Sequence, residues 1–205
     1  MGAQLQPIRD AEKVHDVTVA LSRLDGFRGN RMFLLWVVGI NLGLRIGDLI
    51  DLKVGDVRDA AVYTYMPHKQ ARKKGAHKIT IPIPKEVRKV VRARCRDMPA
   101  DAWLFPSRKK TAAGKRQKPI TRQTALADMR EIGRIGGIEQ RIGCHTMRKT
   151  FGYHYYQRHK DIGILQEWFY HTSPSTTLIY IGVALENFEG MVRKNPFDDM
   201  DGVRL

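Results

Sequence analysis

The feature that most constrains the fold is an apolar run at residues 32–42. Its sequence, MFLLWVVGINL, is hydrophobic on nearly every side, which is typical of a helix buried inside a domain. Gly43 follows directly and is expected to end this helix. The longest unbroken apolar stretch, residues 32–38, is too short to cross a bilayer, and the N-terminus lacks an apolar signal region. The chain must therefore cover this helix with others, and it is expected to be cytoplasmic with no membrane partner.

Several further segments have helical or strand patterns. Asp10 is predicted to cap a helix that reaches about Leu24, and a turn is expected over residues 25–30. Residues 61–66 and 78–83 form short β-type runs around a basic loop, which favours a hairpin. A helix is expected to begin at Thr121 or Thr124. Other predicted helices lie within 44–57 and over 84–96, 145–159, 163–169 and 176–188. The predicted class is mainly α with a small antiparallel β-sheet (α+β).

The charge of the chain points to an anionic partner. Lys and Arg number 36 against 21 Asp and Glu, which gives a net charge of +15 and a pI of about 10.1. Duplex DNA or RNA offers the densest regular negative charge. The alternative is a basic protein whose charge only keeps it soluble. Cys95 and Cys144 match no zinc spacing and are interpreted as structural thiols in a reducing compartment, so no metal or cofactor is expected.

Four scattered segments carry side chains suited to a phosphate. Arg45 follows a glycine turn at a helix start, and the hairpin loop holds Lys74. His145 and Arg148 are three residues apart, so both lie on one helical face. Further on come His171 and, nine residues later, Tyr180. Each of these residues alone has a simpler structural explanation, such as a packed tyrosine or a solvated arginine.

Together the segments resemble the catalytic domain of the tyrosine recombinase (phage integrase) family. GLRIGDLIDLKVGDV is similar to the first arginine box of that family, and LFPS to the stretch before its variable loop. HTMRKTF resembles the H-x-L-R box, and YHTSPSTTLIY the G-H-x(8)-Y box. The resemblance extends from about residue 7 to 190. It implies the integrase catalytic-domain fold and a site-specific recombinase that cuts and rejoins double-stranded DNA through a 3′-phosphotyrosine, without a metal.

The resemblance also implies a role for each residue. Tyr180 is the expected nucleophile, and Arg45 and Arg148 are expected to clamp the non-bridging phosphate oxygens. His145 and His171 would bind the phosphate or manage the tyrosine proton. Lys74 is the expected general acid, although Lys73 is adjacent and Lys69 also fits. Two arginines and a lysine would remove the need for a divalent metal.

Basic residues in the hairpin loop, in the loop at 108–118 and after Arg148 are candidates for contact with the DNA backbone. The loop at 108–118 could equally be a solvated linker. The candidates are Lys69, Arg72, Lys73, Lys78, Arg108, Lys109, Lys110, Lys115, Arg116, Lys118 and Lys149.

Three positions depart from the pattern of the family. Asp48 stands where glutamate is frequent and is expected to orient Arg45 from behind. Tyr170 replaces the glycine that usually precedes the second histidine, so the turn there must tolerate a side chain. Lys149 stands where histidine is common. The aromatic set is expected to serve the core and interfaces: Tyr153, Tyr155, Tyr156, Trp168, Phe169 and Tyr170.

The expected organisation is a loose arm at 1–9, a catalytic domain at 10–190 and a tail at 191–205, with no N-terminal core-binding domain. A separate partner could supply that domain. Leu185, Phe188 and Met191 are the apolar anchors by which the C-terminal helix would join copies on DNA, or else pack in cis. Two rival functions remain at this point: a catalytically silent DNA-binding regulator of recombination, and a relaxing enzyme resembling type IB topoisomerases.

Overall fold

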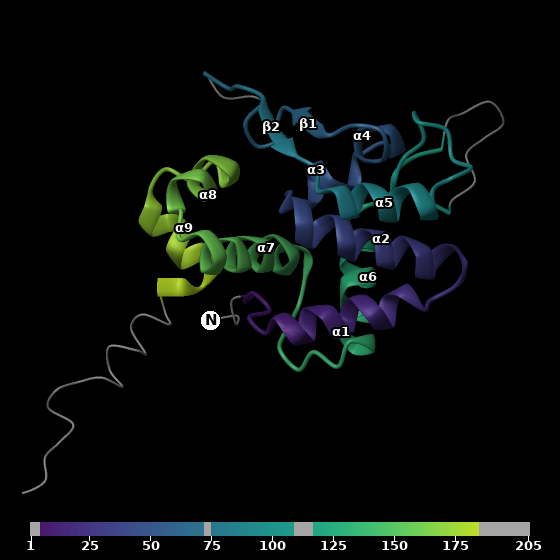
Figure 1. Ribbon diagram of the computed structural model, residues 1–205, viewed down its shortest axis with the longest axis horizontal. Coiled ribbons are helices and arrows are strands. Elements are labelled where there is room, and N and C mark those ends of the chain that lie inside the picture. The colour runs from purple at the N-terminus through teal and green to yellow at the C-terminus, as the bar shows by residue number, and fades with distance from the viewer. Residues whose placement is uncertain (1–4, 72–74, 109–116, 185–205) are drawn as a thin grey trace, which may run out of the picture.

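The computed structural model describes residues 5–71, 75–108 and 117–184 (Figure 1). In these residues the chain is mainly helical, with one two-stranded antiparallel sheet, as predicted. The elements are α1 (Ala11–Ser22), α2 (Gly26–Leu42), α3 (Ile46–Ile50), α4 (Val54–Arg58), β1 (Val62–Tyr65), β2 (Ile79–Pro82), α5 (Lys85–Arg94), α6 (Arg122–Ile135), α7 (Cys144–His159), α8 (Ile162–Phe169) and α9 (Pro174–Ile181).

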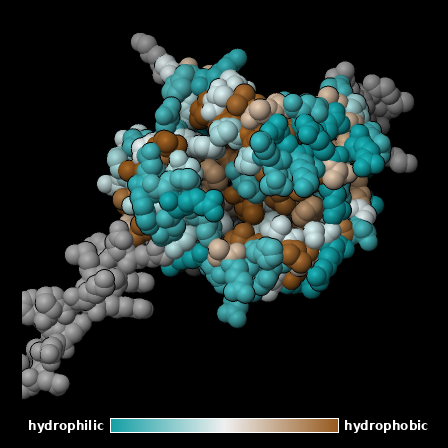
Figure 2. Space-filling model, viewed as in Figure 1, coloured by the Kyte–Doolittle hydropathy of each residue, from teal (hydrophilic) through white to brown (hydrophobic). Residues whose placement is uncertain are grey.

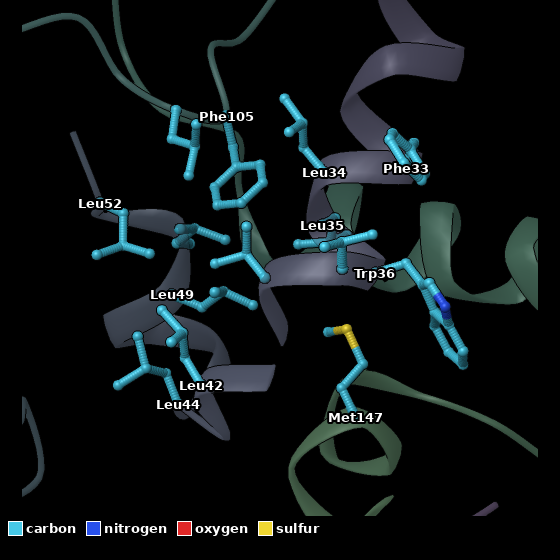
Figure 3. Close-up of a cluster of buried hydrophobic side chains, with 14 of the residues drawn as sticks. Phe33, Leu34, Leu35, Trp36, Leu42, Leu44, Leu49, Leu52, Phe105 and Met147 are labelled. Atoms are coloured by element: carbon cyan, nitrogen blue, oxygen red, sulfur yellow. The ribbon is translucent and has the colours of Figure 1, made fainter. Parts of the chain in front are cut away.

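Helix α2 is the centre of the fold, and α1, α5, α6 and α7 pack around it (Figure 1). Its middle is almost wholly buried, and Trp36 and Leu35 have no exposed surface. Figure 3 shows side chains of α2 in one cluster with Leu49 of α3, Phe105 and Met147 of α7. The helix ends at Gly43, whose φ of +58° is the left-handed conformation that glycine favours. The predicted buried helix is confirmed.

The start of α2 corrects one prediction. A turn was expected over residues 25–30, but the helix already begins at Gly26. Glycine at two of these positions resembles a turn signal. Gly29, however, allows close packing, because a Cβ atom built on it would lie 2.8 Å from Cβ of Leu24. Arg31, two residues further on, is held in the interior by its ion pair with Asp128. Tertiary contacts therefore override the local pattern.

The two-stranded sheet confirms the predicted hairpin. Val62 pairs with Pro82 and Tyr65 with Ile79 in antiparallel register. Tyr65 and Ile81 are buried, so one face of the ribbon joins the main core. The described residues of the loop between the strands lie away from that core, at the edge of the molecule (Figure 1).

Helices α8 and α9 form a second, smaller cluster beside the main core. Its buried residues are Leu165, Phe169, Ile181 and Val183, with aromatic side chains of α7 packed against them. Ser173 caps α9 by accepting from the N–H of Thr176. A helix was expected over residues 176–188, but α9 ends before Gly182, whose φ is +82°. The rest of that prediction, with Leu185, Phe188 and Met191, lies outside the described residues.

Residues 5–9 do not form the loose arm that was expected. The N–H of Ile8 donates to Oγ1 of Thr150 at 2.9 Å, and the carbonyl of Ile8 lies 2.9 Å from Nε2 of His154. Ile8 is buried, and the carbonyl of Pro7 accepts from the side chain of Gln140. This segment therefore packs on α7. The local sequence does not indicate these contacts, because the two partners in each contact lie more than a hundred residues apart along the chain.

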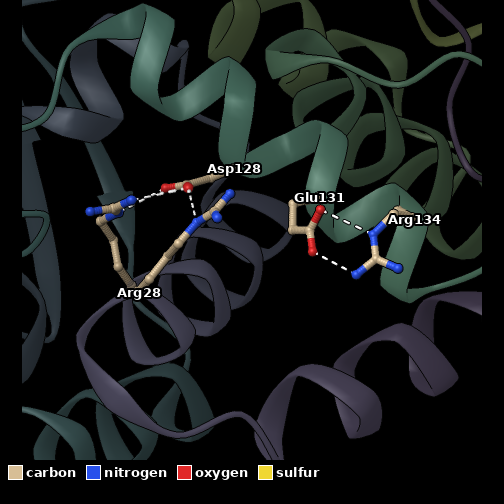
Figure 4. Close-up of polar contacts among 5 residues, drawn as sticks. Arg28, Asp128, Glu131 and Arg134 are labelled. Atoms are coloured by element: carbon tan, nitrogen blue, oxygen red, sulfur yellow. Dashed lines mark hydrogen bonds and ion pairs between the residues drawn. The ribbon is translucent and has the colours of Figure 1, made fainter.

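One buried ion pair ties α2 to α6. Arg31 donates from Nε and Nη2 to the two carboxylate oxygens of Asp128, at 2.7 and 3.0 Å. Figure 4 shows the Asp128 carboxylate with Arg28, whose Nε lies 3.4 Å from Oδ1. It also shows the exposed pair of Glu131 and Arg134 one turn along α6. Since Asp128 is only 1% exposed, its pair is part of the interior.

The face of the molecule seen in Figure 2 is mostly hydrophilic. On the face seen in Figure 2, hydrophobic side chains gather near the middle, and teal side chains surround them. None of the helices in the described part of the chain is both long and apolar enough to span a membrane.

Candidate active site

The candidate site forms where α7 begins, between the turn after α2 and the corner joining α8 to α9. Arg148, on the second turn of α7, is only 1% exposed. Its Nη1 donates to the carbonyl of Gly43 at 2.6 Å, and its guanidinium carbon lies 4.1 Å from the centre of the Phe169 ring. Its Nη2 is buried and has no hydrogen-bond partner in the described residues. The site thus contains a fixed guanidinium with spare donors.

Within residues 5–71, 75–108 and 117–184, Arg148 forms no ion pair with a carboxylate. Burial, together with the nearby charge of Arg45, lowers the pKa of Arg148 to about 10. A group with that pKa is still protonated at neutral pH. A buried cation without a counter-ion is costly, so the arrangement fits an anion that arrives from outside, such as a phosphate.

Arg45 brings the second guanidinium to the same place. It is the N-cap residue of α3, directly after the turn that ends α2. Its Nη2 donates to the carbonyl of Phe169 at 2.7 Å, and this contact joins the arginine turn to the end of α8. Each predicted arginine is therefore held by a backbone carbonyl rather than by an acidic side chain.

Tyr180 lies on α9 beside both predicted histidines. Its Oη is 3.3 Å from Nδ1 of His145, and its ring centre is 5.0 Å from that of His171. Burial raises the pKa of Tyr180, while the charges of Arg148 and Arg45 act in the opposite direction. The hydroxyl thus has a hydrogen-bond partner able to take its proton, and cations close enough to favour the phenolate.

Both histidines are held neutral near pH 7. Burial, Arg148 and Arg45 together lower the pKa of His171 to about 4. Its Nδ1 lies 3.1 Å from Oγ1 of Thr177. The pKa of His145 is also lowered, first by desolvation of its ring and then by nearby cations including Arg148. A neutral imidazole can accept a proton, which is what a neighbour of a nucleophilic tyrosine must do.

Two predicted residues are placed differently from expectation. Lys149, a candidate for backbone contact, is only 4% exposed, and its Nζ lies 5.0 Å from the centre of the Tyr180 ring. It is therefore packed inside the site and is not a surface contact. Asp48 was expected to orient Arg45, but its Oδ1 accepts a hydrogen bond from the backbone N–H of His68 at 2.9 Å. Nε2 of the His68 ring lies 4.0 Å from the same oxygen. Asp48 thus anchors the hairpin loop.

The other basic candidates divide into two groups. Lys69, Lys78, Arg108 and Lys118 are exposed, as a contact to DNA requires. Lys69 is also close enough to His145 to lower its pKa. The following candidates lie outside the described residues: Arg72, Lys73, Lys74, Lys109, Lys110, Lys115 and Arg116. The general-acid assignment of Lys74 therefore stays a prediction.

Sequence reasoning missed two residues near the site. Arg122, at the start of α6, lies against Gly47, where a Cβ atom would be 2.7 Å from its Nη2. No local signal distinguishes it from other basic residues. Tyr170 was placed among packing aromatics, yet its hydroxyl donates to the carbonyl of His77 at the hairpin. The sequence did mark this position as unusual, since Tyr170 replaces a glycine at a turn.

A bound metal ion would require a group of side chains that can ligate it. Within the described ranges, no group of three or more His, Cys, Asp and Glu side chains is placed to hold a metal ion. Cys95 is a buried free thiol and Cys144 a half-buried one.

Comparison with known proteins gives a consistent result. The model of the phage integrase family matches residues 26–186. A probable integrase/recombinase, YoeC of Bacillus subtilis, is 38% identical over 87% of this chain and 90% of its own length. Tyrosine recombinase XerA of Pyrococcus furiosus is 30% identical over 84% of this chain. The match spans only 57% of that relative.

Solved structures share the fold at lower sequence identity. The crystal structure of XerA recombinase has a TM-score of 0.68 at 22% identity, covering 95% of this chain and 67% of the other. The catalytic domain of bacteriophage HP1 integrase has a TM-score of 0.57 at 18% identity and covers 96% and 98% of the two chains. With the fold, the family model and the similarity to YoeC in agreement, the chain belongs to the phage integrase family.

Proposed function

We propose that the protein is a site-specific DNA recombinase that cuts and rejoins duplex strands through a 3′-phosphotyrosine at Tyr180. One observation carries the proposal. The hydroxyl of Tyr180 lies 3.3 Å from Nδ1 of His145. It is beside Arg148, a buried arginine that has spare donors and no carboxylate partner in the part of the chain that the structure describes. This is the arrangement that nucleophilic attack on a phosphodiester requires.

The cleavage step follows from these contacts. Oη of Tyr180 attacks the scissile phosphorus and passes its proton to His145. The bond between phosphorus and the 5′ oxygen breaks, and that oxygen takes a proton, for which Lys74 is the proposed donor. The phosphate stays on the tyrosine as a diester. Attack by a 5′ hydroxyl of another strand reverses the step, so no high-energy cofactor is consumed.

Arg45 and Arg148 supply the positive charge in this scheme. Guanidinium groups bind two phosphate oxygens at once and stay protonated at neutral pH. They stabilise the negative charge that grows on the phosphate in the transition state. We therefore expect cleavage to persist when divalent cations are chelated. A loss of cleavage in EDTA that magnesium restores would contradict metal independence.

Duplex DNA is the proposed partner. The net charge of +15 favours a polyanion. A structural neighbour, the recombinase XerH, was solved bound to its palindromic difH substrate, with a TM-score of 0.65. Such a substrate has two half-sites, so we propose that copies of this protein act together on DNA in the cytoplasm. The C-terminal segment from residue 185 is the proposed contact between copies.

The test uses a nicked suicide substrate, which traps protein on DNA when the cleaved strand diffuses away. The wild type should form a covalent adduct, and Tyr180→Phe should form none. Tyr155→Phe is the matched control, because Tyr155 packs on α7 against Phe151 and His159. Binding without any wild-type adduct would favour a silent regulator instead. Relaxation of supercoiled DNA of any sequence would favour a topoisomerase-like activity.

A further inference from the structure

Tyr170 occupies a backbone turn that a glycine would fit better. It ends α8 with φ +53° and ψ +47°, in the left-handed region. Its N–H donates to the carbonyl of Glu167, and the N–H of His171 donates to that of Gln166, both at 3.0 Å. This pair of hydrogen bonds forms a helix C-terminus that usually has glycine at the left-handed position. A tyrosine there costs roughly 1–2 kcal/mol, so the turn alone does not explain its side chain.

The side chain reaches the hairpin. Its hydroxyl donates to the carbonyl of His77 at 2.5 Å, across 93 residues of sequence. The rings of Tyr170 and His77 also lie 5.0 Å apart, centre to centre, at an angle of 37°. His77 is two residues before β2 begins. Tyr170 thus attaches one end of the hairpin loop to the α8–α9 corner.

The other end of the same loop has an attachment of its own. The backbone N–H of His68 donates to Asp48 of α3 at 2.9 Å. The imidazole of His68 lies 3.2 Å from the carboxylate of Asp51. The loop is therefore held on the β1 side to the helix that follows Arg45, and on the β2 side to the corner that precedes Tyr180.

The neighbours of Tyr170 place this attachment next to the reacting groups. The carbonyl of Phe169 accepts from Arg45 at 2.7 Å. His171, on the other side, has its ring 5.0 Å from that of Tyr180. Three consecutive residues therefore touch an arginine, the hairpin and the tyrosine, and any shift of the hairpin relative to this corner is a shift relative to the phosphate.

We propose that Tyr170 is a positioning residue, which holds the hairpin against the α8–α9 corner so that the proton donor of the hairpin meets the leaving 5′ oxygen. The inference rests on the proposed function and on the assignment of the donor to the loop that ends at His77. The donor assigned there, Lys74, precedes His77 by three residues in the sequence. The attachment itself involves only described residues.

The experiment compares two leaving groups. Tyr170→Phe removes only the hydroxyl, and Tyr170→Gly also relieves the left-handed turn. Single-turnover cleavage is measured on a suicide substrate with an ordinary 5′ oxygen, and on one with sulfur at that bridging position. A thiol has a pKa of about 8.5, so the thiolate departs without a proton donor. We expect both variants to cleave the oxygen substrate about tenfold more slowly, because small displacements of a catalytic group are costly. The sulfur substrate should be cleaved within about twofold of the wild-type rate, since general-acid catalysis is bypassed.

Melting temperature separates this role from a structural one. Tyr170→Gly should melt at the wild-type temperature or above it, because glycine suits the turn. Tyr155→Phe should leave both cleavage rates unchanged. Equal slowing on both substrates would overturn the proposal and place the defect at the phosphate clamp. Unchanged rates would overturn it too and leave Tyr170 as a helix end only. An adduct from Tyr180→Phe would instead refute the proposed function, whatever Tyr170 does.

Discussion

Two regions of the molecule each bury an arginine, and they treat its charge in opposite ways. At the α2–α6 interface, Arg31 is 7% exposed and donates two hydrogen bonds to the carboxylate of Asp128. At the start of α7, Arg148 is 1% exposed and meets a backbone carbonyl and a phenyl ring. Its Nη2 has no partner among the described residues.

The difference distinguishes an arginine that stabilises the fold from one that is proposed to bind a ligand. A buried charge is tolerated when a partner of opposite sign and good geometry compensates it. Arg31 has such a partner inside the chain. Arg148 has no such partner in the described segments, and burial lowers its pKa to about 10. We therefore propose that a bound anion compensates the charge of Arg148 in the α7 region, whereas Asp128 already compensates that of Arg31 at the α2–α6 interface.

The largest expected effect is on stability at the α2–α6 interface. Asp128→Asn removes the negative charge and leaves Arg31 buried without compensation, which should lower the free energy of unfolding by about 3–5 kcal/mol. Glu131→Gln is the matched control on the same helix, since its partner Arg134 is 73% exposed, and surface pairs contribute less than about 1 kcal/mol. Urea unfolding measures both variants (Figure 4). Equal losses in the two would remove the distinction between the pairs.

The second largest expected effect is on the rate of DNA cleavage. Here the substitution should impair cleavage without lowering stability. Arg148→Met should slow single-turnover cleavage by about 10²–10³-fold, the usual cost of removing one donor to a transition-state oxyanion. Its melting temperature should stay the same or rise, because an uncompensated buried charge is removed. Arg31→Met is the matched variant: it should destabilise the protein and leave cleavage by the folded fraction unchanged. A strongly destabilised Arg148→Met would show that Arg148 is a structural residue like Arg31.

Structural features that depend on residues close together in the sequence could be predicted, and those that depend on distant residues could not. The buried helix, its end at Gly43 and the hairpin depend on neighbours a few residues away, and all three are confirmed. Of the two predicted helix starts, Thr121 and Thr124, the structure has the cap at Thr121. The family resemblance rests on the order of short boxes, and the family match confirms it.

What escaped prediction depends on contacts between distant segments. Ile8 is buried by its partners on α7, and Lys149 is buried beside Tyr180. Helix α7 has polar and aromatic residues on all sides, so its sequence does not show which side faces inward. Tyr170 was noticed as a departure from glycine, but its contact with His77 crosses 93 residues. The buried pair of Arg31 and Asp128 was missed for the same reason.

The smallest expected effect tests whether the surplus of positive charge around Arg148 acts on its neighbours. His171 has its pKa lowered to about 4 by burial and by Arg148 and Arg45, while an unfolded chain binds that proton near pH 6.5. Between these values the unfolded state holds more protons than the folded state. The free energy of unfolding therefore falls as the pH is lowered from 7 to 4.

The contribution of His171 appears as a difference between two proteins. Wild type should lose about 1 kcal/mol more stability than His171→Asn between pH 7 and pH 4.5, a figure reduced for the partial solvent exposure of the ring. Urea unfolding at pH 7 and pH 4.5 measures the free energy of unfolding of both proteins. The contributions of all other titrating groups are common to both and cancel in the difference. Bound duplex DNA should shrink the difference, because phosphate offsets the charge of the arginines. An identical loss in both free proteins would mean that His171 is not held neutral and that the positive charge of Arg148 does not reach it.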